Sequence, residues 1–136
     1  MILDTSVIAK WFLEETDTEI ALLIRDDYVS GKIDIEIPDL LLYELANVLR
    51  YKGFSAKEIG DAIKSIFSMD FLIITPTETL MRMAAEISKM CNITIYDAVY
   101  VAVGKSFGTQ IITADKKLYE NAKQYNVILL SQYEVH

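Results

Sequence analysis

The sequence predicts an α/β fold in which helices cover both faces of a parallel β-sheet. Short apolar runs of strand length alternate along the chain with longer segments of helical periodicity. No internal repeat and no linker-like stretch interrupts this alternation. The 136 residues fit one domain, spanning 1–136, because two independent cores would each be too small.

The first half of the chain is expected to supply two strands and four helices. An apolar run predicts a strand over 1–4, and apolar residues alternating with acids predict another over 33–37. Apolar residues at helical spacing predict helices over 5–13, 20–29 and 39–52. Ser55 and Glu58 have the spacing of a capping box, which starts the fourth helix.

The second half continues the same alternation with three strands and three helices. The strands are expected over 71–75, 110–113 and 127–130, and the helices over 76–90, 95–107 and 115–124. Thr94 is a capping residue and Gly108 a stop residue for the middle helix of this half. Because helices separate the strands, neighbouring strands are expected to be parallel.

Three aspartates stand at the end of a predicted strand or in the first turn of a predicted helix. Asp4 ends the first strand, Asp97 lies in the first turn of the helix capped by Thr94, and Asp115 follows the strand over 110–113. Each has an ordinary interpretation as a helix cap or a first-turn acid. Ligands of open parallel sheets bind beyond the carboxyl ends of the strands, where all three would meet. Like charges crowded there repel unless a positive group joins them.

Glu44 is harder to explain as a cap, because it lies inside the predicted helix over 39–52. Leu40 and Val48 occupy the positions four residues before and after it, so no ion pair forms within the helix. It is either exposed at the edge of the apolar stripe, paired with a distant base, or held there to bind a cation.

Four carboxylates without histidine or cysteine are a donor set suited to Mg²⁺ or Mn²⁺. The chain has one cysteine, Cys91, and one histidine, His136, so a His/Cys zinc site or a histidine relay is nearly excluded. Two divalent ions can hold the attacking water and the leaving oxygen of a phosphodiester. Without metal, at least one of these acids is expected to have a raised pKa because of its charged neighbours.

Composition limits the remaining classes of function. With 20 acidic and 13 basic residues the formal net charge is −7, unlike a general nucleic-acid coat protein. Nucleic acid is then a partner only if metal offsets this charge. No membrane span or signal peptide is expected, and a single cysteine fits a reducing cytoplasm. A mean hydropathy of +0.25 and apolar helices over 40–49 and 81–90 favour a homodimer.

The acidic positions lie in four motifs that together resemble those of PIN-domain nucleases. The motifs are Leu3-Asp4-Thr5-Ser6-Val7, Tyr43-Glu44-Leu45-Ala46-Asn47-Val48-Leu49, Ile95-Tyr96-Asp97-Ala98-Val99-Tyr100-Val101-Ala102 and Ile112-Thr113-Ala114-Asp115. Each motif alone is weak, but all four occur in order and cover essentially the whole chain. Length and motif order resemble the VapC-type toxins of toxin–antitoxin pairs.

This resemblance implies an α/β/α sandwich and Mg²⁺- or Mn²⁺-dependent cleavage of RNA, with no membrane involvement. Asp4, Glu44, Asp97 and Asp115 match the catalytic and metal-binding acids of the family. Thr5, Ser6 and Thr113 match small hydroxyl positions and are expected to orient a carboxylate or a water. The resemblance also implies a homodimer inhibited by a cognate antitoxin. Two alternatives stay open: an RNA-processing or decay nuclease without an antitoxin, and an inactive PIN-like binding module.

Overall fold

Five parallel strands form one sheet in the order β3-β2-β1-β4-β5. The computed structural model describes residues 1–134, so His136 and the end of the predicted 1–136 unit lie outside it. The strands are β1 (Ile2–Leu3), β2 (Glu36–Pro38), β3 (Leu72–Ile74), β4 (Ile111–Thr113) and β5 (Val127–Leu129). The expected α/β fold with an all-parallel sheet is confirmed.

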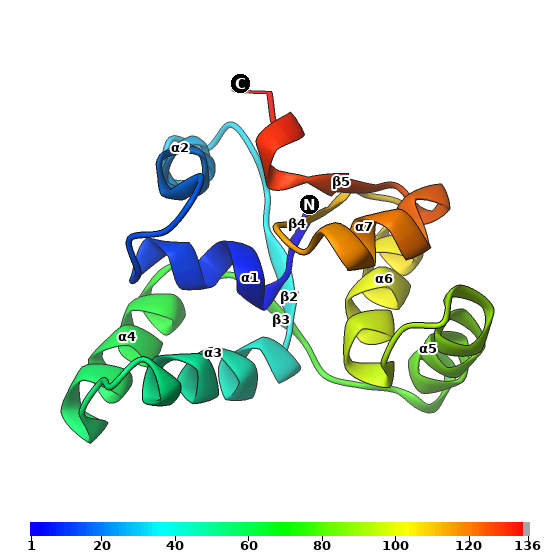
Figure 1. Cartoon of the computed structure of the whole chain (residues 1–136), viewed down its shortest axis with the longest axis horizontal. Helices are drawn as coiled ribbons and strands as arrows, with labels where there is room; N and C mark the ends of the chain where they lie inside the picture. The colour runs from blue at the N-terminus through cyan, green and yellow to red at the C-terminus, as the bar shows by residue number, and fades with distance from the viewer. Residues whose placement is uncertain (135–136) are drawn as a thin grey trace.

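Helices cover both faces of this sheet, as the alternating pattern predicted. In Figure 1, α1 to α4 lie on one side of the strands and α5 to α7 on the other. The helices are α1 (Thr5–Ile8), α2 (Thr18–Val29), α3 (Leu40–Tyr51), α4 (Ala56–Ser68), α5 (Glu78–Cys91), α6 (Ile95–Phe107) and α7 (Lys116–Ala122). Short 3₁₀ turns cover Ala9–Trp11, Lys123–Tyr125 and Leu130–Gln132. The helices change side because of the strand order. The chain adds β2 and β3 on one side of β1 and then crosses back to add β4 and β5 on the other side.

The strand expected over 33–37 is shorter and shifted, running from Glu36 to Pro38. The neighbouring strand β1 has two residues, and its Ile2 is in register with Glu36, so the chain before Glu36 has no ladder partner there. The amino group of Met1 instead donates to the Asp34 carbonyl at 2.7 Å and to a Glu36 carboxylate oxygen at 3.0 Å.

The core explains which faces of the helices are apolar. On α3, Leu41, Leu45 and Leu49 are fully buried at successive four-residue steps. These three residues pack into the chain's own core, so they are not available to the homodimer contact expected of the apolar helix over 40–49; Tyr43 on the same helix is exposed. Helix α6 is buried without a break from Ala98 to Gly104, because it lies against both the sheet and α5. Within residues 1–134, no helix is long and apolar enough to cross a membrane.

Gly104 allows α6 to approach β4 closely. A Cβ atom at this position would overlap two carbon atoms of the fully buried Ile111 side chain, so one of the two residues would have to shift. Gly60, inside α4, has nothing within 4 Å of the corresponding position. We therefore expect Gly104→Ala to lower the free energy of unfolding by about 1–3 kcal/mol, as overpacking does.

Gly60→Ala is the matched control, also inside a helix. It should leave the fold intact and raise the free energy of unfolding by up to about 1 kcal/mol, the difference in helix propensity. Urea denaturation of both variants measures the difference. Equal stabilisation by the two substitutions would contradict the close packing of α6 on β4.

Candidate active site

The candidate site lies where the strand order of the sheet reverses. Strands β1 and β4 are adjacent, with Leu3 in register with Ile112, and the Asp4 amide donates to the Ile112 carbonyl at 3.2 Å. Asp4 follows β1 directly, and Asp115 follows β4 after one intervening residue. In doubly wound sheets this reversal point opens a crevice beyond the strand ends, where ligands bind.

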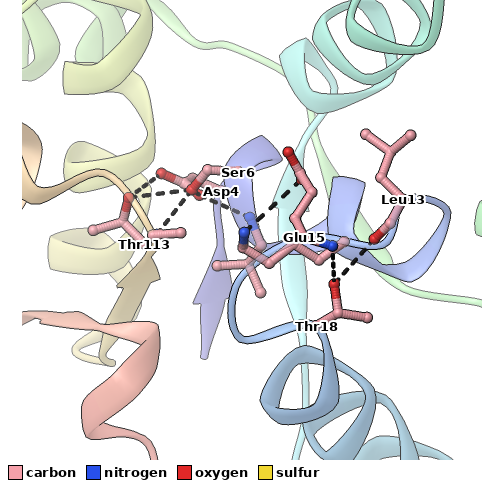
Figure 2. A network of polar contacts seen from close by, with 9 residues as sticks. Asp4, Ser6, Leu13, Glu15, Thr18 and Thr113 are labelled. Carbon is pink, nitrogen blue, oxygen red and sulfur yellow. Dashed lines mark hydrogen bonds and ion pairs between the residues drawn. The ribbon is translucent and has the colours of Figure 1, made fainter. Parts of the chain in front are cut away.

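Asp4 is held in a buried cluster of hydroxyl groups. Ser6 Oγ donates to its Oδ1 at 2.5 Å, and Thr113 Oγ1 donates to its Oδ2 at 2.5 Å. Figure 2 shows these three side chains gathered together. Oδ1 also accepts a 3.3 Å bond from the Val7 amide, so Asp4 is the cap of α1 that the sequence predicted as one interpretation.

Burial raises the pKa of Asp4 from its ordinary value of 3.8 to about 6. The charge of Asp97 adds to the rise, while the hydrogen bonds from Ser6, Thr113 and Val7 oppose it. The expected raised pKa is therefore present, but its main cause is loss of solvation rather than repulsion between carboxylates.

Glu44 reaches the same region from α3 and is held by two hydroxyl groups. Its Oε1 accepts bonds from Thr5 Oγ1 at 3.0 Å and from Tyr100 Oη at 2.6 Å. The two hydroxyls lie 2.8 Å from each other. Burial first, and then the charge of Glu44, raise the pKa of Tyr100 above its usual range, so it stays a donor. In residues 1–134 Glu44 forms no ion pair, and its Oε2 accepts no protein hydrogen bond.

Asp97 and Asp115 complete the acidic group from the starts of two helices. Burial first, then the charges of Asp115 and Glu44, raise the pKa of Asp97. The backbone amide of Asp97 donates to Thr94 Oγ1 at 3.1 Å, the capping bond that the sequence predicted. One oxygen of Asp115 caps α7 through bonds from the Lys117 and Leu118 amides at 2.9 and 3.2 Å. All four acids thus lie at one edge of the sheet and interact electrostatically.

A cavity of about 400 Å³ lies beside this acidic group, and two of the four acids line it. Glu44 and Asp115 line it directly, whereas Asp4 and Asp97 do not. Asp4 lies beneath the lining residue Ser6, which hydrogen-bonds to it. The other charged residues in the lining are Glu15 and a single cation, Lys10. This wall is strongly acidic.

Tyr100 belongs to the third acidic motif, but the sequence did not reveal that its hydroxyl contacts the site. It is 1% exposed, but its hydroxyl binds Glu44 across 56 positions of sequence. One indication was available: Tyr100 lies three residues after Asp97 on α6, so both face the same direction.

The chemistry of these donors fits a small divalent cation. All four acids offer hard oxygen ligands, and the raised pKa values of Asp4 and Asp97 mean that added positive charge would favour their ionised forms. Within residues 1–134, no three Asp, Glu, Cys or His side chains are close enough together to bind one ion at once. Mg²⁺ does not need such a cage, because it keeps several waters and uses one or two carboxylates directly.

Comparison with known proteins identifies the family of the chain. The model of the PIN domain matches residues 1–124. The chain belongs to the PIN-domain family. One relative, ribonuclease VapC3 of Pyrobaculum aerophilum, is 26% identical over 125 residues, covering 88% of this chain and 92% of the relative.

Solved structures share the fold over nearly the whole length of this PIN domain. FitAcB from Neisseria gonorrhoeae has a TM-score of 0.73 at 19% identity, covering 97% of this chain and 99% of that chain. VapC20 of Mycobacterium tuberculosis, described as a sarcin-ricin loop cleaving toxin, has a TM-score of 0.70 at 18% identity. That match covers 88% of this chain and 92% of VapC20.

Asp4 should make the stability of the PIN domain depend on pH. Folding raises the pKa of Asp4 to about 6, so the protonated carboxyl group favours the folded state. Its contribution to the free energy of unfolding is complete below pH 3.8 and is lost as the pH rises through 6. In metal-free buffer we expect Asp4→Asn to raise the free energy of unfolding at about pH 8, by up to about 3 kcal/mol. Near pH 4 the same substitution should have little effect.

Urea denaturation at both pH values measures this difference, and the low-pH comparison is the internal control. A stabilisation of the same size at both values would mean that Asp4 is ionised at low pH in the folded protein.

Proposed function

We propose that the protein is a metal-dependent endoribonuclease and the toxin of a toxin–antitoxin pair. The proposal rests on the position of four acids in a PIN domain. Near the point where the strand order reverses lie Asp4, Glu44, Asp97 and Asp115. A relative named as a ribonuclease supports RNA as the substrate. A cytoplasmic location, where RNA is present and the free thiol of Cys91 stays reduced, belongs to the same proposal.

The four acids would hold Mg²⁺ or Mn²⁺. When bound, the ion supplies charge to offset the phosphodiester and lowers the pKa of a water. Ser6 and Thr113 bind the two oxygens of Asp4 and keep this carboxylate from rotating. Thr5 and Tyr100 occupy one oxygen of Glu44 and leave the other for a ligand.

Loss of one acid should remove most of the activity without unfolding the protein. We expect Asp4→Asn and Asp97→Asn each to lower the rate of cleavage of single-stranded RNA by roughly 100-fold or more, because a full charge is lost from a hard-cation site. EDTA should abolish cleavage, and Mg²⁺ or Mn²⁺ should restore it. The products should carry 5′-phosphate and 3′-hydroxyl ends.

Glu86→Gln is the control, because Glu86 is exposed on α5 and borders no part of the site. It should cleave RNA at the wild-type rate. Cleavage that persists in EDTA, or that both aspartate variants carry out at the wild-type rate, would refute a metal-dependent reaction at these acids. RNA binding without any cleavage by the wild-type protein would favour a binding role.

Tyr100 is expected to act as a positioning residue through Glu44. Tyr100→Phe keeps the buried ring and removes the hydroxyl that donates to Glu44. We expect Mn²⁺ to bind about 10- to 100-fold more weakly to this variant, in line with loss of an outer-shell partner. Isothermal titration with Mn²⁺ measures this, and thermal unfolding checks the fold. Unchanged Mn²⁺ affinity in a folded Tyr100→Phe variant would exclude the positioning role.

An antitoxin and a second copy of the chain are the proposed partners. Structural neighbours include a toxin–antitoxin complex from Klebsiella pneumoniae, which supports the first, at a TM-score of 0.70 and 16% identity. Tyr43 and Tyr51, which are 70% and 78% exposed on α3, support the second. Expression of the protein alone should inhibit growth, and co-expression of an antitoxin encoded by the adjacent reading frame should relieve that inhibition. Sedimentation should show that the protein is a dimer. Without such a neighbouring frame, an RNA-processing role would take precedence over the toxin.

A further inference from the structure

A second cavity adjoins the carboxylate cavity. It measures about 260 Å³ and shares two lining residues, Lys10 and Ala114, with the first. Ala114 presents only a methyl group at this shared wall. The remaining lining residues of the second cavity come from the loop before α2, from the start of α7, and from the end of β5 and the 3₁₀ turn after it. They are Thr16, Asp17, Lys116, Leu129, Leu130 and Ser131.

The charge of the lining changes sign between the two cavities. The carboxylate cavity is lined by three acids, Glu15, Glu44 and Asp115, against one base, Lys10. The second cavity is lined by two bases, Lys10 and Lys116, against one acid, Asp17. A polyanionic strand that enters the acidic cavity therefore meets its nearest positive charges at the shared wall and beyond it.

Lys10 is an unusual residue to find at this wall. Its side chain is 10% exposed, yet within residues 1–134 its ammonium group donates no hydrogen bond. In the same part of the chain its one ion pair is with Glu15, at 3.9 Å. The loop that carries Glu15 is fixed by Thr18, whose hydroxyl accepts from the Glu15 amide at 2.9 Å and donates to the Leu13 carbonyl at 3.0 Å (Figure 2). An ammonium group has three donors, so Lys10 keeps capacity for an anionic ligand.

We infer that the second cavity is a subsite for the RNA backbone beside the cleaved bond. Lys10 binds the phosphate that lies over the shared wall at Ala114, and Lys116 binds the next phosphate along the strand. The inference rests on the proposed ribonuclease function. It distinguishes Lys10 and Lys116 from Lys117, which is exposed on α7 and lines neither cavity.

RNA binding tests the subsite without any need for cleavage. Lys10→Met keeps the apolar stem and removes the charge, and Lys116→Met does the same at an exposed position. Fluorescence anisotropy with a labelled single-stranded RNA in Ca²⁺ should show about tenfold weaker binding for each variant. The slope of log affinity against log salt should fall by about 0.7 for each lost phosphate contact. Lys117→Met is the matched control and should bind within about twofold of wild type.

Cleavage of shortened RNAs then locates the effect. Both shortened RNAs keep the bond that is cut. One has no phosphates on the 5′ side of that bond, and the other has none on its 3′ side. The variants should lose activity on full-length RNA and match wild type on one of the shortened RNAs, because that RNA lacks the phosphates in question. Equal losses on every RNA would place Lys10 in the carboxylate site and overturn the subsite.

Wild-type affinity and salt slope in both Lys10→Met and Lys116→Met would also overturn it. A wild-type protein that binds RNA through Lys10 and Lys116 but never cleaves it would refute the proposed function and leave the subsite standing. Because Lys116 is exposed, its variant decides the question even if Lys10→Met fails to fold.

Discussion

The pairing of β1 with β4 is the constraint on which the rest of the site depends. Strand β1 has two residues, and its ladder continues into the bond from the Asp4 amide to the Ile112 carbonyl. That register places Asp4 beside Thr113, whose hydroxyl binds the carboxylate. A slip of one residue between β1 and β4 would turn Asp4 to the other face of the sheet and separate its carboxylate from the Thr113 hydroxyl. The core residues Ile2, Leu3 and Ile112, all fully buried, oppose such a slip.

Hydroxyl groups rather than bases hold the acids in place. Thr5, Ser6, Thr113 and Tyr100 all donate to Asp4 or Glu44, and none of them carries a charge. Such donors fix the direction of a carboxylate without neutralising it. An arginine or lysine in the same position would satisfy the negative charge and leave no site for a cation. This choice of partners explains how the site remains both ordered and negative.

Local signals predicted the helices well because the interactions that start and stop a helix lie within a few residues. Helix α6 runs over 95–107 as predicted, with the Thr94 hydroxyl bound to the Asp97 amide and Gly108 in the left-handed region at φ 64°. The capping box of Ser55 and Glu58 also forms as expected. The strand predicted over 33–37 was placed too early, because a strand begins where a partner strand begins, and β1 meets it at Glu36.

The sequence by itself determined the alternating α/β pattern and singled out the four acids, Asp4, Glu44, Asp97 and Asp115. It did so because caps, apolar periodicity and motif order are properties of neighbouring residues. Only the tertiary structure decided that Tyr100 binds Glu44, that the apolar stripe of α3 is buried within the chain, and that Lys10 lies between two cavities of opposite charge. Each of these depends on contacts between segments far apart in sequence, and side chains that meet only after the sheet has formed leave no local pattern by which to recognise them.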